Sequence, residues 1–373
     1  MSIGSDRYVH FTYDANLRLT AIDARTTSGS TANQPATYQY DTDSLLTQLN
    51  FGGRTVAFTR HPGNGLLQSV SVGSLAETWS HNGFAEPTGY SAVWGTSPRL
   101  SFAYTRDKLG RITQVQEDGS RTTGYAYDLA GRLIRVTRNG EQIAEYGYDA
   151  NSNRITATYA ASLASTLSAC APNTGPLAAD VDAQDRMTRY GTCVYAYGAN
   201  GERVQKTDTA SGHITAYQYD EFGNLRQANL PDGRTISYGI DGLNRRVTKS
   251  IDGQLQGSWL YKDALEPIAE LDAAGNFVSL FAYGEKPHVP SLMRKGSTAY
   301  KIVSDHLGSV RQVINLSTGA VVQALDYDAW GNVLQDTNPG FQPFGFAGGL
   351  YDRDTGLVRF GARDYDPVSG RWT

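Results

Sequence analysis

Short runs in which apolar and polar residues alternate recur along this chain of 373 residues. Residues 123–127 read Thr-Gly-Tyr-Ala-Tyr, and residues 214–219 read Ile-Thr-Ala-Tyr-Gln-Tyr. Alternation with a period of two residues is typical of β-strands that bury one face. No long Ala/Leu/Glu/Lys tract indicates a helix. The pattern predicts an all-β chain built from many short strands.

A turn motif recurs between these runs. It begins with Tyr-Asp and carries Gly three positions after the Asp, and the repeat Asp at 107, 128 and 149 are 21 residues apart (128 − 107 and 149 − 128). Its clearest copies are Tyr127, Asp128 and Gly131; Tyr219, Asp220 and Gly223; and Tyr327, Asp328 and Gly331. The Asp can accept hydrogen bonds from the following amides, and Gly supplies the left-handed conformation that reverses the chain. We interpret the motif as structural, because calcium loops concentrate several acidic oxygens whereas each repeat here carries about one fixed Asp.

A second turn signal lies inside each repeat, 11 or 12 residues after the repeat Asp (118 − 107 and 232 − 220). Asp-Gly and Asn-Gly favour tight hairpin turns in which both central residues have positive φ. Each repeat is therefore predicted to be one β-hairpin, joined head to tail to the next. The four pairs are Asp118-Gly119, Asn139-Gly140, Asp232-Gly233 and Asp252-Gly253.

Composition excludes several classes of protein. The chain is 40% hydrophobic, 11% aromatic and only 19% charged, which indicates ordered structure. The net charge is -4 and the Lys and Arg residues are scattered, so no nucleic-acid partner is expected. No apolar run reaches the roughly 18–20 residues of a membrane span, and no signal peptide is visible at the start.

The repeat lapses over residues 160–180, where Ala, Ser, Thr and Pro dominate. We interpret this stretch as a surface excursion between repeats. Cys170 and Cys193 lie within or just beyond it, and either a disulfide or two reduced, half-buried thiols fits their spacing. Two cysteines without clustered histidines do not form a zinc site, so no metal or other cofactor is predicted.

The C-terminal quarter carries three specific segments. Residues 300–311 read Tyr-Lys-Ile-Val-Ser-Asp-His-Leu-Gly-Ser-Val-Arg, residues 326–332 read Asp-Tyr-Asp-Ala-Trp-Gly-Asn, and residues 361–372 read Gly-Ala-Arg-Asp-Tyr-Asp-Pro-Val-Ser-Gly-Arg-Trp. This order resembles the core module of bacterial Rhs proteins. The Tyr-Asp repeat itself is shared by Rhs proteins, the C component of insecticidal toxin complexes and the animal teneurins. The resemblance covers nearly all of the chain.

This resemblance implies a fold and a set of partners. The hairpins would join into one long antiparallel sheet that winds as a spiral shell. In the bacterial members the shell encloses a toxic C-terminal domain, which we expect to be missing from the present sequence, and works with secretion or delivery machinery. We expect residues 1–282 to form the shell segment and residues 283–373 to hold the last repeats and the start of a plug. We also expect sheet edges that are open to self-association.

The resemblance also implies one chemistry. The family plug cleaves the chain that follows it with two aspartates and an adjacent arginine, and Arg363 and Asp364 match the arginine and the first aspartate. Two close carboxylates share one proton, so one can act as base and the other as acid. The second aspartate would follow Thr373, so the chain as given is expected to be inert. An ordinary ion pair of Arg363 with Asp364 is the structural alternative.

Asp305 and His306 resemble two thirds of a hydrolase triad. A triad needs a positioned nucleophile, and no Gly-x-Ser-x-Gly elbow occurs in the chain. We interpret this segment as a structural turn.

The sequence thus predicts a structural shell fragment of a bacterial polymorphic toxin, secreted or at the cell surface in the full-length protein. One alternative is a surface adhesion or carbohydrate-binding module, and another is a self-cleaving plug in a longer chain. A concave interior lined by inward-facing residues favours encapsulation, whereas an exposed aromatic cleft favours glycan binding.

Overall fold

A computed structural model describes residues 7–26, 36–164, 167, 170 and 176–373. Strands occupy most of these residues, and the only helices among them are α1 (Ala161–Ala164) and a single 3-10 turn (Phe346–Gly348). Thirty strands form one sheet, and four more form a second, small sheet. The predicted all-β fold is therefore confirmed.

The large sheet is a continuous meander, because each strand pairs antiparallel with the next one in the chain. Its first half consists of β1 (Arg7–Tyr13), β2 (Leu19–Thr26), β3 (Ala36–Tyr40), β4 (Leu46–Phe51), β5 (Arg54–Arg60), β6 (Leu67–Val72), β7 (Leu75–His81), β8 (Pro87–Trp94), β9 (Ser97–Arg106), β10 (Ile112–Glu117), β11 (Arg121–Tyr127), β12 (Leu133–Arg138), β13 (Glu141–Tyr148), β14 (Arg154–Tyr159) and β15 (Leu177–Val181). Its second half consists of β16 (Met187–Tyr190), β17 (Cys193–Tyr197), β18 (Arg203–Asp208), β19 (His213–Tyr219), β20 (Leu225–Asn229), β21 (Thr235–Ile240), β22 (Arg246–Ile251), β23 (Gln254–Tyr261), β24 (Pro267–Leu271), β25 (Phe277–Ala282), β26 (Leu292–Lys295), β27 (Thr298–Ser304), β28 (Val310–Asn315), β29 (Val321–Tyr327) and β30 (Val333–Asp336). The predicted head-to-tail hairpins are thus present throughout the described part of the large sheet.

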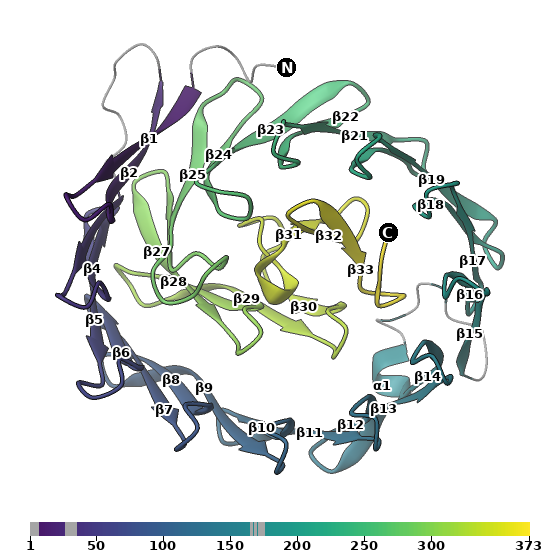
Figure 1. The fold of residues 1–373 in the computed structure, drawn as a ribbon, viewed down its shortest axis with the longest axis horizontal. Helices are drawn as coiled ribbons and strands as arrows, with labels where there is room; N and C mark the ends of the chain where they lie inside the picture. Colours follow the sequence, from purple (N-terminus) through teal and green to yellow (C-terminus); the bar gives the residue numbers. More distant parts are fainter. Residues whose placement is uncertain (1–6, 27–35, 165–166, 168–169, 171–175) are drawn as a thin grey trace.

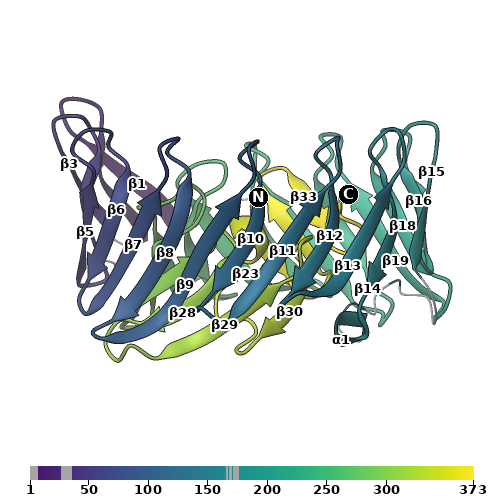
Figure 2. The same ribbon diagram turned by 90° about the horizontal axis from the view of Figure 1, so that it is seen from below.

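The sheet winds as a spiral. Strands β1 to β23 run once around a ring, and from β24 onward the sheet passes inside the beginning of that ring (Figure 1). Seen from the side, the ring is a wall of tilted strands, and β28 to β30 lie towards one of its rims (Figure 2). We call β26 to β30 the inner turn. The second sheet comprises β31 (Leu350–Asp352), β32 (Leu357–Phe360), β33 (Arg363–Asp366) and β34 (Arg371–Trp372), lies in the middle of the ring, and is called the closing sheet below (Figure 1).

The Tyr-Asp turns have the geometry that the sequence predicted. In the copy at Asp128, one carboxylate oxygen accepts the Arg132 amide at 2.9 Å, the Gly131 amide donates to the Asp128 carbonyl at 3.0 Å, and Gly131 has a φ of 83°. The carboxylates of Asp220 and Asp328 likewise accept amides two and four residues further on. These turns are therefore held by contacts within five residues of chain.

Arginine four residues after the turn Asp is a feature that the sequence analysis missed. The Arg132 side chain pairs with Asp128 at 2.6 Å and lies over the ring of Tyr148, with its Cζ 4.9 Å from the ring centre. The Tyr148 hydroxyl in turn donates to the Leu133 carbonyl at 2.6 Å. The same Asp–Arg–Tyr arrangement links one turn to the next in other repeats, with Arg18, Arg111, Arg186 and Arg245.

Three of the four predicted tight turns have positive φ at both central residues, as at Asn139 (50°) and Gly140 (87°). The prediction for Asp232-Gly233 is wrong, because only Gly233 has positive φ there. In a two-residue hairpin turn the preceding residue must donate its amide to the opposite strand, and Pro231 has no amide hydrogen. The turn is instead one residue longer, and the Leu230 amide donates to the Arg234 carbonyl at 2.8 Å.

The main hydrophobic core lies between the first part of the ring and the inner turn. Leu49, Val56 and Val70 from the ring and Ile302 and Val313 from the inner turn are at most 2% exposed. A buried charge cluster joins the same two layers, because the Lys301 ammonium lies 3.1 Å from the Glu77 carboxylate and 2.7 Å from that of Glu285. The spiral is therefore held by contacts between successive layers.

The predicted division at residues 282 and 283 falls inside the large sheet, because β25 pairs with β26 across it. The separate sheet begins only at Leu350, and the division into two parts stays a prediction. Among the described residues, β1 pairs only with β2 and β30 only with β29. Self-association through these edges also stays a prediction.

Candidate functional site: the closing sheet against the ring wall

The predicted catalytic residues Arg363 and Asp364 are the first two residues of β33 in the closing sheet. This strand pairs with β32, so that Arg359 lies opposite Asp364. Successive side chains of a strand point to opposite faces. Arg363 and Asp364 are therefore expected to lie in different surroundings, and they do.

Asp364 is 2% exposed and faces the ring wall. Both of its carboxylate oxygens accept hydrogen bonds from the Arg246 guanidinium, at 2.9 and 3.1 Å. Arg359 donates to the same carboxylate at 2.8 Å and, through its other terminal nitrogen, to the Asn224 side chain at 2.9 Å. Among the described residues, the side-chain partners of this carboxylate are thus two arginines, with no second carboxylate.

Arg363 is exposed and does not contact Asp364. Its guanidinium lies over the Trp372 ring, with Cζ 4.3 Å from the ring centre. The structure therefore does not bring the two predicted residues together, and neither the catalytic role nor the simple ion pair is supported by a contact between them. The arginines that hold Asp364 are Arg246 and Arg359, which come from elsewhere in the chain.

Two further acidic positions fasten the closing sheet to the wall. The Asp366 carboxylate accepts from Arg203 at 2.6 Å and from the Ser369 hydroxyl at 2.8 Å, and all three residues are at most 4% exposed. Asp352 accepts from the Tyr238 hydroxyl at 2.6 Å and from Lys249 at 2.8 Å. The closing sheet thus presents acidic side chains, and the ring wall presents basic ones.

Charge also sets the acidity of Asp366. Burial by itself would raise the pKa of this carboxyl, but the charges of Arg203 and Lys206 and the hydrogen bonds of Arg203 and Ser369 lower it well below its usual value. Asp328, a turn Asp of the repeat motif, is the opposite case. Burial raises its pKa, although hydrogen bonds from Asn332 and Trp330 act against this rise.

The low pKa of Asp366 predicts acid sensitivity. A carboxyl group whose pKa is lower in the folded than in the unfolded chain stabilises the fold at pH values above its unfolded pKa of about 3.9. This stabilisation is lost as the pH falls from there towards the folded pKa. We expect the difference in the free energy of unfolding between the wild-type chain and Asp366→Asn to shrink steadily from pH 5 to pH 2.5, measured by urea unfolding. A difference that stays constant over this range would contradict the assignment.

The basic residues of the wall follow a rule that is visible in the sequence. The fifth residue after a turn Asp starts the next strand and is apolar in most repeats, as at Leu133 and Leu225. In three repeats this position holds arginine: Arg154 follows Asp149, Arg246 follows Asp241, and Arg203 follows Gly198, which stands in place of the turn Asp. Each of these arginines is at most 4% exposed. Arginine at a predicted core position is the signal that could have located the contact surface of the closing sheet.

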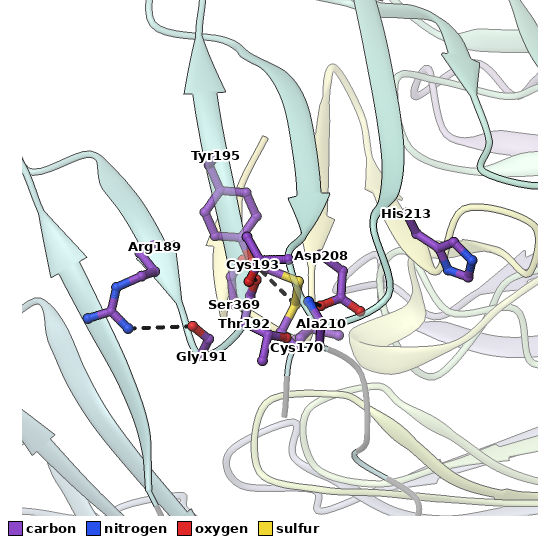
Figure 3. Close-up of a disulfide and its surroundings, with 12 residues drawn as sticks. Cys170, Arg189, Gly191, Thr192, Cys193, Tyr195, Asp208, Ala210, His213 and Ser369 are labelled. Carbon is purple, nitrogen blue, oxygen red and sulfur yellow. Dashed lines mark hydrogen bonds between the residues drawn. A yellow bond between two sulfur atoms is a disulfide. The ribbon is translucent and has the colours of Figure 1, made fainter. Parts of the chain in front are cut away.

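Cys170 and Cys193 form a disulfide at the start of β17 (Figure 3). Both are at most 2% exposed, and the Thr192 amide donates to the Cys170 carbonyl at 3.0 Å. Gly191 permits this close approach, because a Cβ on it would lie 1.9 Å from the Cys170 carbonyl oxygen. The disulfide thus attaches the excursion at 160–180 to the wall, although residues 165–166, 168–169 and 171–175 lie outside the described residues.

The segment with His306 is a turn of the repeat type. The Asp305 carboxylate accepts the amides of Leu307 and Ser309 at 3.0 and 2.9 Å, and His306 packs edge-on against Tyr104. Burial lowers the pKa of His306, and the charge of Asp305 acts against this shift. Among the described residues, no group of three His, Cys, Asp or Glu side chains is arranged to hold a metal ion.

The amino-acid sequence is matched by a family model described as Teneurin YD-shell, over residues 5–373. The chain belongs to this family. The predicted membership of the Rhs and Tyr-Asp repeat proteins is therefore confirmed. No helix in the described part of this YD-shell chain is long and apolar enough to cross a membrane.

The relatives of this YD-shell chain are much longer proteins. Teneurin-1 of Gallus gallus is 36% identical over 200 residues, which are 52% of this chain and 7% of that protein. The tRNA nuclease WapA of Bacillus subtilis is 26% identical over 197 residues, or 52% of this chain and 8% of that protein. A solved structure of the Photorhabdus luminescens Tc holotoxin pore covers 98% of this chain and 20% of its own length, with a TM-score of 0.64 and 14% identity. This structural likeness concerns the fold alone.

Proposed function

We propose that this chain is a wall segment of a polypeptide-enclosing shell, with the closing sheet as an internal lid. The observation that carries this proposal is that the inner segments of the chain are buried against the inside of the ring. The inner turn and the closing sheet both pack against the inside of the ring, and every acidic anchor of the closing sheet points to the inner wall.

The cavities support an inward-directed function. One of them has a volume of about 250 Å³ and lies between the ring and the inner turn. Tyr125, Tyr146 and Tyr327 line it together with charged side chains such as Arg138 and Asp326. The two most exposed aromatic side chains, Phe84 and Phe222, belong to separate turns far apart along the ring and form no common platform. Encapsulation is therefore favoured over glycan binding.

A cavity of this size cannot hold a folded domain, whose radius of gyration is about 13 Å for 100 residues. We therefore assign the chain to one end of a larger shell, next to the polypeptide that the shell encloses. By analogy with the tRNA nuclease WapA and the Tc toxin, that polypeptide is proposed to be a toxin domain of the same protein, released through delivery machinery.

The disulfide supports a place of action outside reducing compartments. Disulfides persist in secreted and surface proteins and are rare in the cytosol. A secreted or surface-exposed protein is therefore the proposed setting. Within a longer chain, Asp364 is proposed to take part in cleaving the protein after the closing sheet, together with a second aspartate.

Limited proteolysis of the full-length protein tests the shell function. The polypeptide that follows Thr373 should resist a broad-specificity protease while the YD-shell is folded, and should be digested after the shell is opened with denaturant. A following segment that is digested as fast as a free peptide, or the lack of any such segment, would refute the proposal. Asp364→Asn in the same protein should abolish any cleavage beyond the closing sheet.

A further inference from the structure

Arg138 has no close partner in the space between the ring and the inner turn. It is the last residue of β12, and its side chain is 28% exposed. Its Nη2 lies 3.8 Å from the Asp326 carboxylate, which is too long for a hydrogen bond. Protein atoms close off its Nε but leave Nη1 and Nη2 accessible, and no acceptor among the described residues bonds to them.

Asp326 is already neutralised by two other arginines. Arg121 donates to one of its carboxylate oxygens at 2.6 Å, and Arg311 donates to the other at 3.1 Å. Glu117 forms ion pairs with the same two arginines. Together with Arg138, this group contains three guanidinium ions for two carboxylates. Arg138 therefore carries the surplus positive charge.

Tyr125 supplies a second free donor beside Arg138. Thr123 lies opposite Arg138 in the pairing of β11 with β12, and Tyr125 lies opposite Val136. Residues two apart on a strand share a face, so the side chains of Tyr125 and Arg138 are diagonal neighbours on one face. The Tyr125 hydroxyl is not closed off and has no hydrogen-bond partner among the described residues. Burial raises the pKa of Tyr125 to about 12, and the charge of Arg138 acts against this rise.

Both donors line the cavity of about 250 Å³ between the ring and the inner turn. Four aromatic rings line it as well, those of Phe102, Tyr146, Tyr327 and Phe346. An apolar cavity of about 150 Å³ is large enough for benzene, so this one has room for an aromatic ring with a small polar group. Asp305 and Asp328 also belong to the lining, but each carboxylate is bound by two amides of its own turn.

We propose that Arg138 and Tyr125 bind the carboxylate of a small aromatic acid whose ring occupies this cavity. Carboxylate oxygens accept several hydrogen bonds at once, from guanidinium and hydroxyl donors alike. A monoanion matches the one surplus positive charge, whereas a dianion would leave a buried negative charge uncompensated. The aromatic walls favour a planar ring through offset and edge-to-face contacts. The side chains of Arg121 and Arg138 are each 28% exposed, so solvent reaches the arginine end of the cavity.

Titration calorimetry of the 373-residue chain with sodium benzoate at constant ionic strength tests the site. We expect saturable binding and a rise of the melting temperature. Benzamide has nearly the same shape without the charge and should bind at least ten-fold more weakly, because hydrogen bonds between charged groups are the strong ones. Cyclohexanecarboxylate keeps the charge but lacks the aromatic ring, and should bind roughly three-fold more weakly or worse.

Two variants locate the site. Arg138→Gln should weaken benzoate binding at least ten-fold, and Tyr125→Phe, which removes only the hydroxyl, roughly three-fold or more. Arg135→Gln is the matched control, because it removes an arginine of the same strand that is 48% exposed and pairs with Glu145 at 3.5 Å. It should leave benzoate binding unchanged.

Three results would overturn the proposal. The first is benzoate that does not bind saturably, and the second is benzamide or cyclohexanecarboxylate that binds as tightly as benzoate. The third is unchanged benzoate affinity in folded Arg138→Gln or Tyr125→Phe protein, with the melting temperature of the ligand-free variant as the measure of folding. The comparison of the three compounds uses the wild-type chain and does not depend on any variant.

Discussion

Replacement of Asp364 by asparagine is expected to lower the free energy of unfolding by about 3–5 kcal/mol. Asp364 is the common partner of Arg246 and Arg359, and all three side chains are at most 3% exposed. Removal of one member of a buried ion-pair group leaves the remaining charge uncompensated in a medium that solvates it poorly. Asparagine keeps the size of the side chain, so that the effect measured by urea unfolding at pH 7 reports the lost charge.

Arg363→Ala is the matched control for this experiment. Arg363 is the neighbouring residue on the same strand, but it faces outward and contacts the Trp372 ring. Cation–π contacts at exposed sites contribute about 0.5–1 kcal/mol, so the change should be small. Equal losses for the two variants would mean that the ion-pair group around Asp364 does not hold the closing sheet.

Loss of the Cys170–Cys193 disulfide is expected to cost about 3 kcal/mol of stability. The bond closes a loop with a sequence separation of 23 residues, and in the chain-entropy description a loop of this order restricts the unfolded chain by about that amount. The double variant Cys170→Ala/Cys193→Ala should therefore unfold at lower urea concentration and lower temperature than the wild type.

A reducing agent separates the effect of the bond from that of the substitutions. It should lower the melting temperature of the wild-type chain and leave that of the double variant unchanged. An oxidised wild type that melts at the same temperature with and without reductant would show that the excursion is held by other contacts.

The local features of the fold were predictable because the contacts that make them are local. The Asp128 carboxylate bonds to the amide four residues further on, so the turn can be inferred from a short segment. The same reasoning explains the one wrong turn, since Pro231 stands directly before Asp232 in the sequence and excludes the tight geometry. The Asp–Arg–Tyr link was missed because Arg132 and Tyr148 belong to different repeats, although the recurrence of arginine after the turn glycine was visible.

The candidate site was predictable only in part. The sequence singled out Asp364 and Arg363 as catalytic residues, and the role of Asp364 stays a prediction. Strand geometry turns the Arg363 side chain away from Asp364. The actual partner Arg246 is 118 residues distant in the chain. Arginine at a strand position that is apolar in most repeats marks the wall residues that contact the closing sheet. The sequence does not indicate which acidic residue each of these arginines pairs with.

The sequence by itself determined the hairpin repeat, the kind of turn at most strand ends, and the membership of the YD-shell family, because each depends on residues close together in the chain. Only the tertiary structure decided which basic residue of the wall meets which acidic residue of the closing sheet. These pairings depend on how far the sheet has curved after many strands. That curvature accumulates from small twists between neighbouring strands, so no single segment encodes it.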